Sequence, residues 1–334
     1  MDSIFPFDRC PVDILIPVFR VVIDAEMREC ETASSFTDPI RSQAAILLAL
    51  VCQRWKEIIY STPSLWADLV LDFRRDREGL SRDSERIQRR ACSVPISLYL
   101  LNIHHKGSCP GKFRNSPIHD SSLCASGLKD VTALIAQVQH IRHLHLQFAC
   151  IASWGGRLCH PSVFKRSQPQ LAAVESFFVD LSQSTAPLQY ALLRQIGMMP
   201  RLVELHVRGL EACNISYGSS SKLLPSVKRL YITSTNKDVP RHLVSCLLSH
   251  CPHLEEFNLG NLRSLYPPPQ YLLALRRLQT VTASSPDWVL RLFLLKGVEA
   301  PMLKDIFFIE SEVVNPTLLA EFSNLRPLVR IHQT

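Results

Sequence analysis

Hydrophobic and polar positions recur in one six-residue phrase, apolar-x-x-apolar-x-apolar, through the last two thirds of the chain. The phrase begins at seven positions: Ile141, Val174, Leu202, Val227, Leu254, Leu278 and Leu303. Successive starts are 33, 28, 25, 27, 24 and 25 residues apart. The last three positions alternate apolar, polar, apolar, which is the period of a short strand with one buried face. Strands at this spacing are typical of leucine-rich repeats, whose period is about 20–29 residues.

Between the phrases, apolar residues fall three or four apart, which predicts helices. Pro286 predicts the start of one helix that ends at Gly297, and Asn315 predicts the start of another. One strand and one helix per unit predict an α/β solenoid. An ordinary α/β domain also alternates strands and helices, but it would not repeat one phrase seven times. The Asn or Cys that usual repeats carry eight residues after the first leucine is absent from all seven units, so we expect irregular repeats.

The first 72 residues predict a separate helical unit. One expected helix carries apolar residues three or four apart, at Leu15, Val18, Phe19 and Val22. A second helical pattern covers residues 45–59, and residues 66–71 have the alternation of a short strand. Pro17 falls inside the first helical pattern and predicts a kink or a shifted start. The polar stretch 24–41 indicates a loop insertion.

Residues 11–19, 50–59 and 62–66 resemble the F-box. In particular, Leu-Val-Cys-Gln-Arg-Trp followed by Thr-Pro-Ser-Leu-Trp is similar to F-box proteins of mushroom-forming (basidiomycete) fungi, in which leucine-rich repeats follow the F-box. Residues 83–98 are similar to the helix and Pro-x-Ser-Leu strand that come next in that group. The resemblance implies an N-terminal three-helix F-box at residues 1–72, with a polar insertion around 24–41. A leucine-rich-repeat-like partner-binding domain would follow at 73–334.

The same resemblance implies the substrate-recognition subunit of a Skp–cullin–F-box type ubiquitin ligase. Such a chain is not an enzyme; it binds a Skp-type adaptor, and through it a cullin–RING ligase, in the cytoplasm, the nucleus or both. The residues that match the adaptor-binding motif are Pro11, Ile14, Leu15, Val18, Phe19, Leu48, Val51, Cys52 and Trp55. The alternative is a leucine-rich-repeat interaction scaffold unrelated to ubiquitin.

Polar positions of the strand phrases predict a surface for a protein substrate, because they should face away from the core. These positions are His143, His145, His206, Arg208, Tyr231, Thr233, Asn258 and Phe307. The row is weakly basic, so we expect it to suit an acidic or phosphorylated partner. Its Arg and aromatic side chains are of the kinds favoured as interface anchors.

Composition and charge argue against a membrane protein and against a nucleic-acid-binding protein. The longest apolar run, residues 44–52, is too short to span a bilayer, and the N-terminus lacks the pattern of a secretory signal, so we expect no membrane partner. Residues 1–71 carry six basic and ten acidic side chains, a balance of −4. Since the net charge of the chain is +7, the remaining residues carry +11. The most basic stretch, 74–90, contains interleaved acids and no aromatic residue, which favours a solvated helix over nucleic-acid binding.

Candidate chemistry is sparse along the chain. The sequence contains no Gly-x-Gly-x-x-Gly, P-loop, Gly-x-Ser-x-Gly or His-Glu-x-x-His motif, so we expect no catalytic residue and no cofactor. The densest group of metal-binding residue types, Cys246, His250, Cys251 and His253, lacks the paired spacing of a zinc site. The 11 cysteines are scattered and predict reduced, packed thiols.

Overall fold

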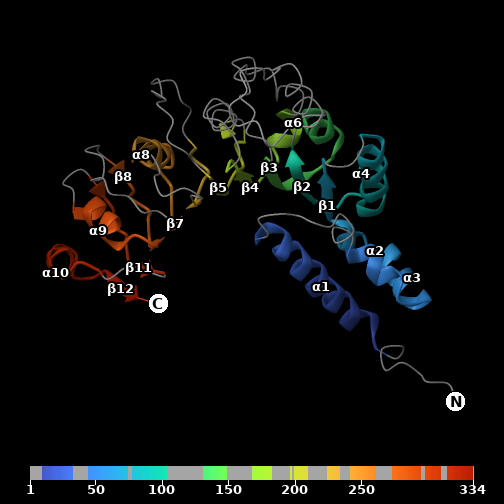
Figure 1. Cartoon of the computed structure of the whole chain (residues 1–334), viewed down its shortest axis with the longest axis horizontal. Coiled ribbons are helices and arrows are strands. Elements are labelled where there is room, and N and C mark those ends of the chain that lie inside the picture. Colours follow the sequence, from blue (N-terminus) through green and yellow to red (C-terminus); the bar gives the residue numbers. More distant parts are fainter. Residues whose placement is uncertain are drawn as a thin grey trace, which may run out of the picture.

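Each short alternating segment of the sequence forms one strand, and the strands pair in chain order into a single parallel sheet (Figure 1). The structure is a computed structural model that describes residues 10–32, 44–73, 77–103, 131–148, 168–182, 196–197, 199–209, 224–233, 241–260, 273–294, 298–309 and 314–333. The ten strands are β1 (Asp68–Asp72), β2 (Ile96–Ile103), β3 (Ile141–Phe148), β4 (Ser176–Asp180), β5 (Glu204–Arg208), β6 (Arg229–Thr233), β7 (Glu256–Gly260), β9 (Thr280–Ala283), β11 (Asp305–Phe308) and β12 (Arg330–Gln333). The predicted α/β solenoid is therefore confirmed.

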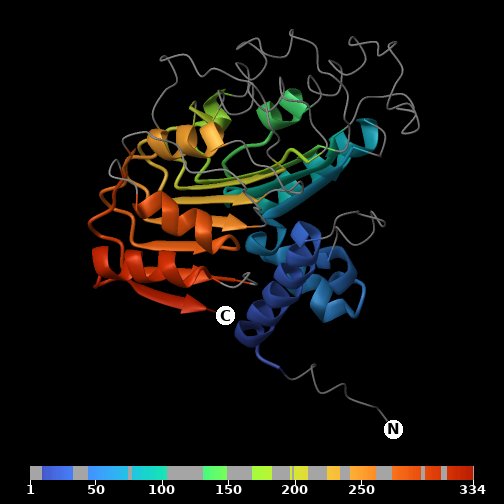
Figure 2. The same cartoon turned by 60° about the vertical axis from the view of Figure 1, so that its left-hand side comes forward.

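Helices connect the strands and lie along the outer side of the curved sheet (Figures 1 and 2). They are α4 (Arg77–Ala91), α6 (Gln168–Leu171), α8 (Arg241–His250), α9 (Pro286–Leu294) and α10 (Pro316–Leu325), together with residues 131–137. A second, two-stranded sheet of β8 (Leu273–Ala274) and β10 (Val298–Glu299) links the connections on either side of β9. The expected start at Asn315 is confirmed, since its side chain accepts a hydrogen bond of 3.0 Å from the Thr317 N–H.

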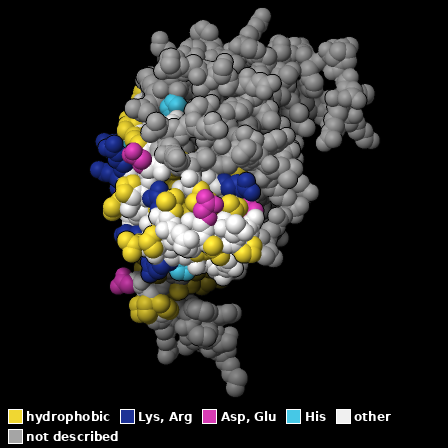
Figure 3. Space-filling model, turned by 90° about the vertical axis from the view of Figure 1, so that its left-hand side faces the viewer, with side chains coloured by type: hydrophobic (Ala, Val, Ile, Leu, Met, Phe, Trp, Pro, Cys, Tyr) yellow, Lys and Arg dark blue, Asp and Glu magenta, His cyan; other side chains and the backbone are white. Residues whose placement is uncertain are grey.

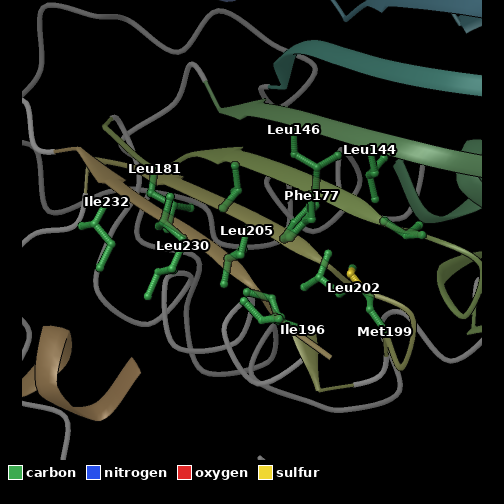
Figure 4. Packing of buried hydrophobic residues seen from close by; sticks show 14 of the residues in the cluster. Leu144, Leu146, Phe177, Leu181, Ile196, Met199, Leu202, Leu205, Leu230 and Ile232 are labelled. Carbon is green, nitrogen blue, oxygen red and sulfur yellow. The ribbon is translucent and has the colours of Figure 1, made fainter. Parts of the chain in front are cut away.

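The core fills the space between the sheet and the helices. By strand register, the central apolar position of each phrase forms one row across the sheet: Leu69, Leu98, Leu144, Phe177, Leu205, Leu230, Phe257, Val281 and Ile306. These side chains are at most 2% exposed. Figure 4 shows members of this row side by side, on the side of the sheet where Ile196 and Met199 also lie. Burying such a side chain is worth roughly 1.5–3 kcal/mol, so the row holds the repeats together.

Polar contacts between neighbouring repeats match the strand register. Arg142 of one unit contacts Glu175 of the next at 2.7 Å, and Lys228 contacts Glu255 at 3.0 Å. These pairs are largely exposed, so each contributes about 0–1 kcal/mol and favours the register more than stability. At the end of β5, Gly209 has φ +75°, and a Cβ there would collide with the backbone of Ser182. That turn therefore requires glycine.

The N-terminal unit consists of α1 (Val12–Thr32), α2 (Ala44–Ala49), α3 (Gln53–Ser61) and the 3-10 helix η3 (Pro63–Trp66). The expectation of a loop from residue 24 is wrong for residues 24–32, because α1 continues to Thr32; residues 33–41 lie outside the described part. Pro17 is inside α1 and neither ends the helix nor delays its start. The inward face of α1 buries Leu15 and Phe19, and the Phe19 ring meets Trp55 edge-on at 4.7 Å.

The Thr-Pro-Ser-Leu-Trp segment joins this unit to the first strand. The Thr62 hydroxyl donates to the Ile58 carbonyl at 2.7 Å at the end of α3, and Pro63 begins η3. The Trp66 indole is buried and donates to the Ile59 carbonyl at 2.8 Å. Both polar groups are thus satisfied by carbonyls at the end of α3, and β1 begins two residues after Trp66.

Candidate functional site: the open face of the sheet and the outer face of the N-terminal helices

A ladder of aromatic and imidazole rings crosses five adjacent strands on the sheet face opposite the core. By register, Tyr99, His145, Phe178, His206 and Tyr231 occupy one row. Neighbouring ring centroids are 5.5, 4.0, 5.9 and 4.1 Å apart along this row. The His145–Phe178 and His206–Tyr231 pairs are stacked, with interplanar angles of 17° and 8°. The row continues through Asn258 and Thr282 to Phe307 and His332, which stack at 4.4 Å. We call this row the ring ladder.

All eight residues predicted for substrate binding lie on this face, although in three rows rather than one. The ring ladder contains His145, His206, Tyr231, Asn258 and Phe307. His143 belongs to the row on one side, and Arg208 and Thr233 pair in the row on the other. The prediction failed for the exposure of His145, which is only 6% exposed; its ring is stacked on Phe178 and lies close to Tyr99.

Burial dominates the electrostatics of the ladder. It lowers the pKa of His145 to about 3, with smaller contributions from His206 and Arg208, so this imidazole is neutral. His206 lies 2.5 Å from the Glu204 carboxylate, a contact that holds the pKa of Glu204 below its usual value. Burial also raises the pKa of the Tyr231 hydroxyl.

The sheet face that carries the ring ladder, which we call the open face, has more acidic than basic side chains, whereas the sequence predicted a weakly basic row. Among the described strand residues on this face, the carboxylates are Asp68, Asp72, Asp180, Glu204, Glu256 and Asp305, whereas the arginines are Arg208, Arg229 and Arg330. Each of these arginines already faces a carboxylate, at 3.7 Å for Asp180, 2.7 Å for Glu204 and 2.8 Å for Asp305. The charge balance therefore does not support the expectation of an acidic partner on this face.

The N-terminal helices expose a second apolar surface. Ile14 and Val18 lie one turn apart on α1 and are 54% and 45% exposed, and Val51 beyond α2 is 60% exposed. Other large aliphatic side chains exposed here are Val12, Val21, Val22, Leu47 and Leu50. We call Ile14, Val18, Val21 and Val22 the outer stripe of α1. Exposed apolar side chains at this density favour a protein interface.

The nine residues predicted for adaptor binding divide between this surface and the interior. Pro11, Ile14, Val18 and Val51 are exposed, Leu48, Cys52 and Trp55 are half-buried, and Leu15 and Phe19 are buried. The Cys52 sulfur accepts a hydrogen bond from the Trp55 N–H at 3.4 Å and so caps α3. Leu15 and Phe19 therefore belong to the core of the helical unit, and Cys52 caps α3 while remaining half-buried.

Two arginines couple the helical unit to the solenoid. The Arg90 guanidinium of α4 lies 4.2 Å from the Tyr60 ring centroid and 4.3 Å from that of Trp66. Arg20 of α1 contacts Asp68 of β1 at 3.1 Å, and donates to the Ser64 carbonyl at 2.9 Å. The outer stripe and the open face are therefore held in one orientation relative to each other.

The C-terminal end of the solenoid also exposes apolar side chains. Leu328 is 90% exposed, Leu325 59% and Met302 47%. On this end, hydrophobic side chains lie between Lys, Arg, Asp and Glu side chains (Figure 3). Neighbouring Leu318 and Leu319 are only partly buried, so the last repeat covers the core incompletely.

Sequence reasoning missed Tyr99, Phe178 and His332. Tyr99 lies in β2, ahead of the first of the seven phrases, and Phe178 occupies in the phrase at Val174 the same position that Tyr231 and Phe307 occupy in theirs. His332 lies in β12, whose segment ends on Gln333 and therefore does not complete the repeated phrase. The signal that identifies all three is the register of the slot, not the residue type.

Two further properties concern only the described parts of the chain. No helix there is long and apolar enough to cross a membrane. No group of three or more His, Cys, Asp or Glu side chains in those parts is placed to hold a metal ion.

The strand order, the parallel register and the helices on one side define an α/β solenoid of the leucine-rich-repeat type. No protein-family model and no curated protein sequence matches the chain. Among solved structures it is similar to the leucine-rich-repeat-containing protein LegL7 from Legionella pneumophila. That similarity has 16% sequence identity and a TM-score of 0.41, and it covers 86% of this chain and 91% of that one.

Proposed function

We propose that this chain is the substrate-recognition subunit of a Skp–cullin–F-box type ubiquitin ligase, acting in the cytoplasm, the nucleus or both. The outer stripe of α1 carries the proposal, because a helical unit that keeps Ile14, Val18 and Val22 in water gains by covering them with a partner. The resemblance of residues 11–19, 50–59 and 62–66 to the F-box names that partner as a Skp-type adaptor.

The outer stripe and the open face would have different binding roles. The outer stripe would bind the adaptor, and the open face of the sheet would hold a protein substrate. Because Arg20 and Arg90 fix the helical unit against the solenoid, a bound substrate would be presented at a defined place relative to the ligase. The contribution of the chain is then positioning rather than chemistry.

The test is binding of the full chain to a purified Skp-type adaptor. The variant Ile14→Asp with Val18→Asp places two charges in the outer stripe and leaves the buried face of α1 intact. Two lost aliphatic contacts of roughly 1.5–3 kcal/mol each predict about a hundredfold weaker binding or more. Leu328→Asp changes a more exposed side chain at the far end of the chain and should bind normally.

Unchanged binding by the double variant, with its helical circular dichroism retained, would contradict the assignment. Substitution of Leu15 or Phe19 is less informative, because both are buried and their loss would unfold the unit.

The second candidate function is a leucine-rich-repeat interaction scaffold unrelated to ubiquitin. It is favoured if the intact chain fails to bind the adaptor while its open face still binds a protein.

A further inference from the structure

The ring ladder is interrupted once on the open face. Between Tyr231 of β6 and Phe307 of β11, the row holds only the short side chains of Asn258 and Thr282. Tyr231 is backed by His206 and Phe307 by His332, at 4.1 and 4.4 Å. Among the described residues, no ring stacks on the sides of Tyr231 and Phe307 that face each other. We call Asn258 and Thr282, with the two flanking rings, the ladder gap.

The size of the ladder gap follows from strand geometry. Three strand intervals separate β6 from β11, which places the two rings about 14 Å apart at a spacing of about 4.8 Å. A tyrosine ring extends further from the sheet than an asparagine or threonine side chain. The outer part of each ring face is therefore uncovered by its neighbour in the row, and both residues are half-buried rather than buried.

One carboxylate lies at the rim of this gap. Glu256 is exposed, and its Oε2 lies 3.4 Å from the Tyr231 hydroxyl, so the charge sits at the tip of the ring. Arg229, which pairs with Glu256 in the strand register, is directed to Glu204 at 2.7 Å. On the other side, Asp305 is occupied by Arg330 at 2.8 Å and His332 at 3.0 Å. Glu256 is therefore the charge on this rim that a partner can neutralise.

We propose that the ladder gap binds an arginine side chain of an extended segment in the protein substrate. The guanidinium would stack on the free face of Tyr231 and donate to the Glu256 carboxylate, and the Asn258 side-chain oxygen would accept a further hydrogen bond. A planar, permanently charged fork satisfies both the ring face and the carboxylate, which an ammonium does less well. This inference rests on the proposed function, because it names the chemistry that the substrate would present.

The probes are immobilised seven-residue peptide pools, randomised except for a fixed central arginine, citrulline or phosphoserine. Citrulline has nearly the shape of arginine without its charge. We expect the full chain to be retained on the arginine pool about tenfold more than on the citrulline pool. Glu256→Gln and Tyr231→Leu should each reduce that ratio to about twofold or less.

A matched control separates this result from general loss of fold or charge. Glu255→Gln changes the adjacent carboxylate, which pairs with Lys228, and should keep the preference. Equal retention of arginine and citrulline, or a preference that survives Glu256→Gln, would overturn the inference. Higher retention on phosphoserine would overturn it in favour of an acidic partner. Adaptor binding of the same samples reports the proposed function separately.

Discussion

At the scale of single residues, the polar slots of the sheet show how position overrides residue type. His145 and His206 occupy equivalent slots in β3 and β5, yet His145 is buried and His206 is half-buried. Both imidazoles have a ring on each side, Tyr99 and Phe178 for His145 and Phe178 and Tyr231 for His206, so ring neighbours alone do not account for the difference. Such neighbours are distant in the sequence, so alternation predicts the face of a residue but not its exposure.

The burial of His145 predicts a pH dependence of stability. Its pKa is about 3 in the folded chain against 6.5 for the free side chain, so between these values the unfolded state binds the extra proton. Stability from this group is therefore complete above about pH 7 and falls as the pH drops through 6.5, by about 2 kcal/mol at pH 5. His145→Phe, beside Tyr99 and Phe178, should shrink the loss between pH 7.5 and pH 5 by that amount.

Urea unfolding at the two pH values measures this effect. His253→Phe removes an exposed histidine and controls for the loss of any histidine. An equal loss of stability in the wild type and His145→Phe would show that the ring accepts its proton in the folded state.

At the scale of elements, α1 contains a proline that the helix accommodates at a cost. Pro17 is exposed, is the sixth residue of α1 and has no N–H to donate to the Asp13 carbonyl. Pro17→Ala should restore that hydrogen bond and stabilise α1 by about 1–3 kcal/mol, without altering the outer stripe. Amide hydrogen exchange of residues 12–32 should slow, while adaptor affinity stays within about twofold. Faster exchange in this segment would show that the proline ring makes a contact that α1 needs.

Most helices and strands were predictable from local sequence, whereas the contacts between side chains of separate repeats were not. The phrases at Ile141 and Leu303 predict β3 and β11 because a two-residue period needs only local sequence. The helical extent of α1 beyond residue 24 was missed, because polar residues look alike in a loop and on a solvated helix. Of the candidate sites, the sequence located the correct face of the sheet. It could not reveal the stacking of Phe307 on His332, which depends on register between separate repeats.

At the scale of the whole molecule, the junction between the helical unit and the solenoid rests on a small set of contacts. Arg90 lies over both Tyr60 and Trp66, whose rings stack on each other at 5.6 Å. Since Trp66 lies two residues before β1, a change at this point affects both the last helix of the unit and the first strand of the sheet. Orientation of the outer stripe relative to the open face therefore depends on a side chain that belongs to neither surface.

Arg90→Ala removes the cation from both rings and should weaken the junction by about 1–2 kcal/mol, the range for a partly desolvated cation–π contact. We expect faster amide exchange in α3 and η3 and a lower urea midpoint, with the exchange of β6 to β11 unchanged. Arg90→Lys keeps the charge and should recover part of the loss. Arg89→Ala is the matched control, because its side chain is 79% exposed and pairs only with Glu85 among the described ion pairs, so its loss should cost at most about 0.5 kcal/mol. If Arg89→Ala and Arg90→Ala behave alike, the junction is held by Arg20 and by the packing of the buried Trp66 rather than by Arg90.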